Sequence, residues 1–194
     1  MMVINITNLK NKALTLGCEV KENVSMKVRM VDCVGYIVDG VLGHEEDGKQ
    51  RLVSTPWSNE AMPFEKAAEI GTKKVIRDHS TIGIVITTDG TVTGIDRRGY
   101  EDPEERVIQE LNELNKPFVI VLNTLTPYSE DTLELKRELE EKYNKPVIPM
   151  NVLDMDEDDI EVVMENVLYD FPVNEININF PKWIEGLEKN HWIK

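Results

Sequence analysis

The sequence predicts an α/β domain built on a mostly parallel sheet with one antiparallel hairpin at its edge. Short apolar runs rich in β-branched residues, at 82–87, 118–123 and 147–150, are typical of strands buried on both faces. Helical patterns separate these runs, and strands that alternate with helices of this length form right-handed βαβ units. Near the start, Ala13–Val20 and Val24–Asp32 alternate between apolar and polar residues, and the polar residues between them predict the hairpin.

Four helices are expected between and after these strands. The first covers Phe64–His79, and the second, Pro103–Asn115, has a proline in its first turn, where a missing N–H costs nothing. Ser129 is a candidate cap for the third helix, which extends to Tyr143. The fourth helix is expected over Asp156–Tyr169.

The composition is that of a soluble globular domain and excludes several classes of function. The chain has 194 residues, 22 Lys and Arg against 36 Asp and Glu, and a net charge of −14. We expect no nucleic-acid partner, because phosphate backbones are bound by clustered basic side chains. No apolar run reaches the roughly 18 residues of a membrane helix, and the start does not resemble a secretion signal. We therefore expect no transmembrane segment and a cytoplasmic location.

The sequence gives little support for metal or disulfide chemistry. Cys18 and Cys33 lack metal-ligand spacing and are expected to be reduced, buried thiols, and three scattered histidines argue against zinc. The segment from Asp154 to Glu165 places carboxylates as a calcium loop does, but Asp159 stands where the sharp turn of such a loop requires glycine. We expect the start of a helix there instead, since carboxylates favour the positive end of the helix dipole.

A candidate nucleotide site lies where the second strand of the hairpin ends. Asp32-Cys33-Val34-Gly35 is a D-x-x-G motif, which in nucleotide hydrolases places a carboxylate beside magnesium and a glycine N–H at the γ-phosphate. The same spacing is common at strand ends, so the motif is weak by itself. Asn123-Thr124-Leu125-Thr126 follows another strand, where a guanine-specific domain carries N-K-x-D. Its lysine and aspartate are missing, so selective recognition of GTP is not expected.

The phosphate loop of nucleotide hydrolases does not occur in these 194 residues. Its pattern, G-x-x-x-x-G-K-[ST], supplies the amides and the lysine that cradle phosphates. Gly48-Lys49-Gln50 lacks the hydroxyl group for magnesium, so a magnesium nucleotide held by Asp32 and one amide should bind weakly. Asp89-Gly90 and Asp96-Arg97-Arg98 are expected to form turns. No Ser/His/Asp or Cys/His catalytic arrangement is evident.

Several blocks of the sequence resemble one protein family. The blocks are Val28–Tyr36, Ser54–Trp57, Pro63–Phe64, Ala67–Thr72, His79–Gly83, Thr87–Gly90 and Glu104–Ile108. They resemble the stage IV sporulation protein A family, cytoplasmic ATPases that polymerise on the forespore surface and form the base layer of the spore coat. The resemblance covers roughly residues 12–194 and continues through Asn190-His191-Trp192.

The resemblance implies a three-layer, P-loop NTPase-like fold, truncated at the N-terminus. It also implies ATP and Mg²⁺ as cofactors, hydrolysis of ATP to ADP and phosphate, self-association, other spore coat proteins as partners, and a place at the forespore surface on the mother-cell side. Asp32 would bind the metal through water and Gly35 the γ-phosphate, with Asn123 as a further nucleotide contact. Tyr36 stands where many GTPases place a water-orienting glutamine. No catalytic residue is assigned, and we expect this chain to be hydrolytically inactive or nearly so.

The resemblance also divides the chain. A divergent N-terminal segment, 1–11, precedes the NTPase-like domain at 12–180, and a C-terminal helical segment covers 181–194. Met2–Ile6 has the composition of a buried strand and is expected to replace the first strand of the family, which runs parallel to the strand ending at Asp32. The alternative for residues 1–11 is a disordered tail.

Two further expectations concern the segment between the hairpin and the first helix. The loop Tyr36–Asn59 is rich in glycine and charge, and we expect it to be the most mobile long segment of the protein. An alternative function is a protein-interaction module or self-assembling scaffold that binds no nucleotide. Such a module would use the surface around Ser54–Ile70 to bind a partner or a second copy.

Overall fold

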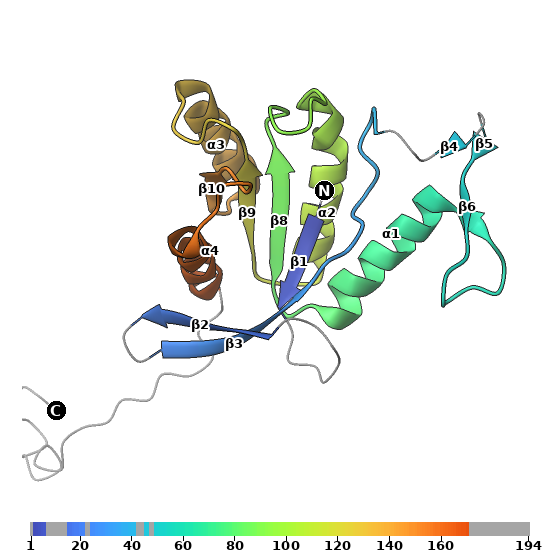
Figure 1. Ribbon diagram of the computed structural model, residues 1–194, viewed down its shortest axis with the longest axis horizontal. Coiled ribbons are helices and arrows are strands. Elements are labelled where there is room, and N and C mark those ends of the chain that lie inside the picture. The colour runs from blue at the N-terminus through green and yellow to red at the C-terminus, as the bar shows by residue number, and fades with distance from the viewer. Residues whose placement is uncertain (1, 7–14, 22–23, 42–44, 47–48, 171–194) are drawn as a thin grey trace, which may run out of the picture.

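A six-stranded sheet organises the fold (Figure 1). The structure is a computed structural model, and it describes residues 2–6, 15–21, 24–41, 45–46 and 49–170. The strands of the sheet are β1 (Met2–Ile6), β2 (Thr15–Lys21), β3 (Val24–Val31), β8 (Gly83–Thr88), β9 (Phe118–Asn123) and β10 (Val147–Met150). They lie in the order β10-β9-β8-β1-β3-β2. The predicted segment 181–194 lies outside the described residues.

The predicted parallel strands and antiparallel hairpin are both present, but the sheet is mixed rather than mostly parallel, because the pairings of β1 with β3 and with β8 are also antiparallel. β8, β9 and β10 are parallel, with Gly83 paired to Phe118 at the start of β8 and β9. β2 and β3 are antiparallel, with Thr15 opposite Arg29. The hairpin continues beyond the end of β1 and projects from one end of the sheet (Figure 1).

β1 lies in the centre of the sheet, between β3 and β8, and so takes the place expected for it. Its direction differs from the expectation, because β1 is antiparallel to both neighbours, with Asn5 opposite Val31 and Ile4 opposite Ile84. The composition of Met2–Ile6 indicates burial and carries no information about direction. Antiparallel pairing is slightly more stable per residue than parallel pairing. β1 therefore begins, rather than ends, at the edge where β8 and β9 end.

Helices cover both faces of the sheet. In the described part of the chain they are α1 (Phe64–Lys74), which continues as the π-helix η1 (Val75–His79), α2 (Arg98–Glu113), α3 (Glu130–Tyr143) and α4 (Glu157–Tyr169). Two small ladders precede α1: β4 (Glu45–Glu46) with β5 (Lys49–Gln50), and β6 (Leu52–Val53) with β7 (Met62–Pro63). None of the helices in the described residues has the length and apolar character needed to cross a bilayer.

The predicted starts of the third and fourth helices are confirmed. The Ser129 hydroxyl accepts the backbone N–H of Thr132 at 3.2 Å, which satisfies one of the free donors at the start of α3. The Asp156 carboxylate accepts the N–H of Asp159 at 3.0 Å, and the Asp159 side chain accepts the N–H of Asp156 in return. The carboxylates that are spaced as in a calcium loop therefore form a capping box at the start of α4.

The predicted start of the second helix was wrong. α2 begins at Arg98, so Pro103 lies inside the helix rather than in its first turn. The Asp96 carboxylate accepts the N–H of Arg98 at 3.0 Å, and the Asp96 carbonyl accepts the N–H of Gly99 at 2.9 Å. These bonds start the helix before the proline. Pro103 lacks the N–H that would have bonded to the carbonyl of Gly99, and the helix continues past it.

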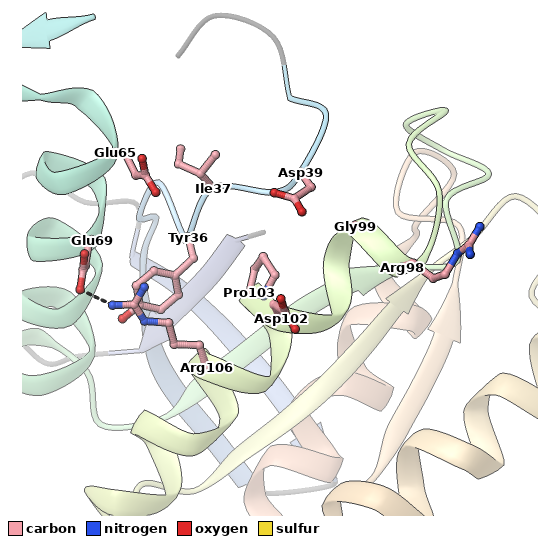
Figure 2. Close-up of a pocket in the computed structure, with 10 residues that line it drawn as sticks. All are labelled: Tyr36, Ile37, Asp39, Glu65, Glu69, Arg98, Gly99, Asp102, Pro103 and Arg106. Atoms are coloured by element: carbon pink, nitrogen blue, oxygen red, sulfur yellow. Dashed lines mark hydrogen bonds and ion pairs between the residues drawn. The ribbon is translucent and has the colours of Figure 1, made fainter. Parts of the chain in front are cut away.

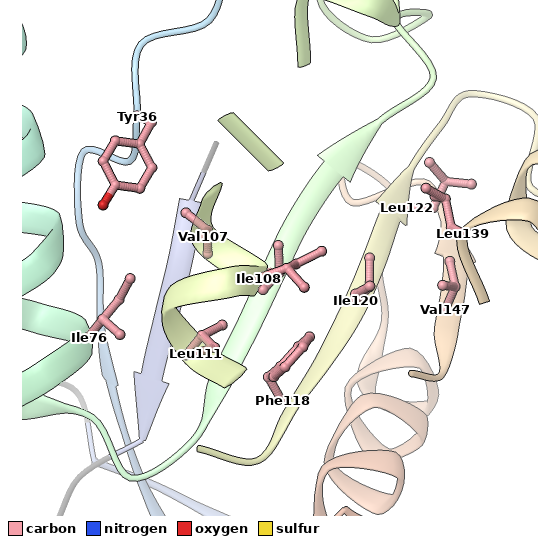
Figure 3. Packing of buried hydrophobic residues seen from close by; sticks show 11 residues of the cluster. Tyr36, Ile76, Val107, Ile108, Leu111, Phe118, Ile120, Leu122, Leu139 and Val147 are labelled. Atoms are coloured by element: carbon pink, nitrogen blue, oxygen red, sulfur yellow. The ribbon is translucent and has the colours of Figure 1, made fainter. Parts of the chain in front are cut away.

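The core has two parts, one on each face of the sheet. The first joins the sheet to η1, α2 and α3 (Figure 3) and contains Tyr36, Ile76, Val85, Val107, Ile108, Leu111, Phe118, Ile120, Leu122, Leu139 and Val147. The second packs the opposite face against α4 and contains Ile82, Ile84, Val119, Val121, Met150, Val163, Met164 and Val167. Alternate residues of β8 and β9 enter opposite clusters, as expected for strands buried on both faces.

Candidate functional site

Asp32 and Gly35 lie directly after β3, at the carboxyl edge of the parallel strands. The Asp32 side chain is exposed, and among the described residues it has no hydrogen-bond or ion-pair partner. Gly35 is buried and has a φ of +78°, a backbone conformation that favours glycine. The two residues therefore occupy the position predicted for them, and the glycine has a structural reason to be there.

Tyr36 turns into the protein rather than toward the sheet edge. Its ring is buried, and its hydroxyl donates a hydrogen bond to the Glu110 carboxylate on α2. The Arg106 guanidinium stacks 4.1 Å from the centre of the ring. Burial, followed by the bond to Glu110, raises the pKa of Tyr36. Tyr36 is therefore bound between helices and is not placed to orient a water molecule.

Ion pairs tie α1 to α2 around this tyrosine. Arg106 on α2 pairs with Glu69 on α1 (Figure 2). Lys73 lies 3.1 Å from Glu69 and 3.7 Å from Glu110. The hydrogen bond from Lys73, with Arg106 beside it, lowers the pKa of Glu69. A cavity of about 160 Å³ lies between the two helices, lined by Tyr36, Ile37, Asp39, Glu65, Glu69, Arg98, Gly99, Asp102, Pro103 and Arg106.

The segment after Tyr36 is docked on the start of α2. Val38 is buried, and a Cβ added to Gly99 would lie 3.0 Å from the Asp39 carbonyl oxygen. A larger residue at 99 would therefore push the segment away. The D-x-x-G segment is thus held by α2 through both Tyr36 and Gly99.

Asp89, after β8, organises the next loop of the edge. Its carboxylate accepts the hydroxyl groups of Thr124 and Thr91, each at 2.6 Å. Burial alone would raise the pKa of Asp89, but these hydrogen bonds outweigh burial and the pKa is lowered. Gly90 has a φ of +95°, and a Cβ there would lie 2.5 Å from the Ile95 carbonyl oxygen. The predicted turn at Asp89-Gly90 is confirmed.

Asn123 connects the loops that follow β9 and β10. Its side-chain oxygen accepts the N–H of Val152 at 3.0 Å, and the N–H of Thr124 donates to the Met150 carbonyl at 3.0 Å. Thr124, where guanine-specific domains have lysine, is fully buried and bonded to Asp89. Asn123 shares the carboxyl edge with Asp32 but is separated from it by β1 and β8.

The buried ion pair between Arg97 and Glu104 was not predicted from the sequence. Glu104 is fully buried and lies 2.8 Å from Arg97, which also donates to the Thr87 hydroxyl at 3.1 Å. Tyr143 on α3 donates to Glu104 at 2.8 Å. In the sequence, Glu104 is one of several charged residues in a row. Its spacing of four from Tyr100 and Ile108, both buried, was the signal that places it on the buried side of α2.

A larger hollow, the α1 groove, has a volume of about 660 Å³ and lies between α1 and the segments 32–34 and 53–57. Its lining is Asp32, Cys33, Val34, Val53, Ser54, Thr55, Pro56, Trp57, Phe64, Ala67, Ala68, Gly71, Lys74, Val75 and His79. The Trp57 ring lies over Gly71, about 3.6 Å from the position of an added Cβ, yet Trp57 is 45% exposed. The groove overlaps the surface around Ser54–Ile70 that the alternative function would use, and it extends to 32–34 and 71–79.

The comparisons with known proteins identify the family. The family described as "Stage IV sporulation protein A, ATPase domain" matches residues 5–172. The chain belongs to this family. It is 74% identical to stage IV sporulation protein A of Clostridioides difficile over 176 residues, which cover 91% of this chain and 36% of the relative. The proteins of the same name from Bacillus anthracis and Bacillus subtilis are 48% and 47% identical, each over 95% of this chain and 37% of their own length.

The resemblance found in the sequence blocks is thus confirmed as membership of the stage IV sporulation protein A family. The chain spans little more than a third of the length of these relatives. The match to the ATPase-domain family begins at residue 5, inside β1, whereas the sequence blocks placed its start near residue 12. No solved structure matches the chain.

Proposed function

We propose that this chain is a P-loop NTPase-like domain that serves assembly of the spore coat and does not hydrolyse ATP by itself. The observation that carries the proposal is the direction of β1. In P-loop sheets the central strand is parallel to the strand bearing D-x-x-G, and its carboxyl end leads into the phosphate loop. In this chain the central place is taken by an antiparallel strand that begins at that edge.

The residues at this edge fit a magnesium ion better than a triphosphate. The exposed carboxylate of Asp32 is a suitable oxygen ligand for Mg²⁺, directly or through water. A triphosphate needs several converging amides and a lysine, and β1 begins rather than ends at this edge, so its carboxyl end does not lead into it. ATP, when bound by family members, supplies a γ-phosphoryl group for transfer to water. In this chain Asp32, Gly35 and Asn123 alone should bind the magnesium nucleotide weakly.

The family supports the remaining parts of the proposal. As part of this proposal, we place the chain in the mother-cell cytoplasm at the forespore surface, in contact with copies of itself and with other coat proteins. The domain division at residues 11 and 180 belongs to the same proposal.

The test is a pair of measurements on the purified chain. Phosphate release from Mg·ATP should equal that of buffer, because oriented amides and the P-loop lysine supply most of the stabilisation of phosphoryl transfer. Calorimetric titration should give weak binding that Asp32→Ala abolishes and Asp39→Ala, an exposed carboxylate in the same segment, preserves. Turnover above background that disappears in Asp32→Ala would contradict the proposal.

The second candidate function is an interaction module that binds no nucleotide. The α1 groove favours it, since a half-exposed tryptophan on an apolar hollow is typical of binding surfaces. Under this candidate, neither the unmodified chain nor Asp32→Ala would bind Mg·ATP at any concentration.

A further inference from the structure

We propose that the α1 groove receives the acidic segment, Leu153–Glu161, of a second copy of the chain. This inference rests on the assembly function proposed above and adds the two surfaces that meet. The acidic segment comprises the end of the loop after β10 and the first turn of α4. The groove lies on α1, at the other side of the sheet (Figure 1).

The groove offers apolar walls with cations at the rim. Phe64 and Ala67 of α1 and Val75 of η1 line it, and Lys74 also lines it and is exposed. The Arg51 guanidinium, outside this lining, lies 5.9 Å from the centre of the Phe64 ring, so a second cation lies next to a residue of the groove. Asp32 is the one carboxylate in this lining, against Lys74 within it and Arg51 next to Phe64. On a chain with a net charge of −14, this hollow therefore repels an acidic segment less than the rest of the surface does.

The acidic segment has the complementary character. It holds six carboxylates and no lysine or arginine within nine residues. Two apolar side chains stand out among them, Leu153 at 78% and Met155 at 39% exposure. Such exposed apolar residues, flanked by charge, fit an apolar hollow with a charged rim.

The acidic segment is rigid enough to bind without a large ordering cost. The Asn151 amide donates to Asp154 at 2.5 Å, and the capping box fixes Asp156 and Asp159. Within the described residues, Glu157 and Asp158 have no hydrogen-bond or ion-pair partner, so their charge is available to a second chain. A preorganised segment loses less conformational entropy when it binds. No group of residues in the described part of the chain has the arrangement of a metal site that would otherwise explain these carboxylates.

The positions of the two surfaces determine what kind of assembly results. The acidic segment follows β10, the strand at one end of the sheet order, while α1 flanks the side of β1 and β3 (Figure 1). A contact between two different surfaces of identical chains is heterologous. When two chains meet in this way, the groove of one chain and the acidic segment of the other remain unused. Further copies add at both ends, so the contact supports growth of a linear assembly rather than a closed dimer.

The test is sedimentation velocity of the 194-residue chain over a range of concentrations. The unmodified chain should associate, and Lys74→Glu or Asp158→Lys should each weaken association about tenfold by placing like charges together. An equimolar mixture of the two variants should associate again, because every contact between unlike chains then joins opposite charges. Matched controls are Lys66→Glu, on α1 but away from the groove, and Glu134→Lys on α3, which should change nothing.

The outcomes separate this inference from the assembly function. A chain that is monomeric at all concentrations contradicts both. Association that Lys74→Glu and Asp158→Lys leave unchanged contradicts the inference alone and assigns assembly to another surface. Circular dichroism verifies that the variants fold, and Leu153→Glu provides a second probe, since a side chain 78% exposed is not needed for folding. Leu153→Glu should also weaken association, and no change would overturn the proposal.

Discussion

The ion pair between Glu104 and Arg97 holds three elements together: α2, β8 and α3. Glu104 on α2 is fully buried, Arg97 precedes that helix and reaches the Thr87 hydroxyl on β8, and Tyr143 joins from α3. Each partner is a charged or polar group that would be costly to bury alone. The four groups therefore depend on one another, and the loop that precedes α2 is fixed by their pairing.

We predict that Glu104→Ala lowers the free energy of unfolding by about 3–5 kcal/mol, because it leaves the Arg97 charge without its buried partner. Glu105→Ala is the matched control, since this neighbouring carboxylate is exposed and pairs with the exposed Lys142, a contact worth about 0–1 kcal/mol. Urea unfolding followed by circular dichroism gives both values. Equal losses for the two variants would show that the buried pair contributes nothing special.

At the residue scale, sequence reasoning found the residues with local signals. Ser129 was recognisable as a cap, Asp156 as the start of a helix and Gly90 as a turn residue, because each acts on its own neighbours in the chain. The partners of Tyr36 and Glu104 were not recognisable, since Glu110 and Tyr143 lie far along the chain. Long-range polar pairs leave no periodic signal, and only the spacing along α2 hinted at one of them.

At the scale of elements, β1 is the part of the fold on which the proposed function depends. Composition predicted a buried strand at Met2–Ile6, and β1 is paired on both sides as that requires. Its antiparallel direction did not follow from composition, because the edges of β3 and β8 accept a strand of either direction. The predicted start of α2 was also wrong. Proline is common in the first turn of a helix, but here the hydrogen bonds to Asp96 start the helix before Pro103.

We predict that a proline in β1 destabilises the whole domain. Backbone N–H groups of successive residues point to opposite sides of a strand, so either Val3 or Ile4 donates toward β8. The more severe of Val3→Pro and Ile4→Pro should therefore cost about 1–3 kcal/mol, because it leaves a backbone carbonyl of β8 without its donor.

Thermal unfolding provides the measurement, with Val3→Ala and Ile4→Val as controls that retain the backbone N–H. If both proline variants unfolded at the temperature of the unmodified chain, β1 would not be part of the stable sheet. The alternative of a disordered tail would then regain support.

At the scale of the whole molecule, packing is strongest around β8 and β9 and weaker in the segment that precedes α1. The side chains of Phe118–Leu122 are at most 3% exposed, and β9 is paired on both edges. The β2–β3 hairpin projects from the end of the sheet, and in the described residues before α1 the two ladders have strands of two residues each (Figure 1). The apolar runs of the sequence predicted this centre, because continuous β-branched residues require burial on both faces. The α1 groove left no such pattern, since its walls come from three separate segments.

This gradient leads to a prediction for amide hydrogen exchange across the loop Tyr36–Asn59. Tyr36 and Val38 are buried against α2, whereas Leu52 and Trp57 are 63% and 45% exposed. We expect amide exchange in 49–59 to be the fastest of the long segments, because few buried contacts oppose local opening of 49–59. Residues 36–38 should be more protected. The reference is 118–122, where exchange requires the centre of the sheet to open. Mass spectrometry of peptic fragments gives both rates, and protection of 49–59 comparable to 118–122 would show that this loop is packed without any ligand.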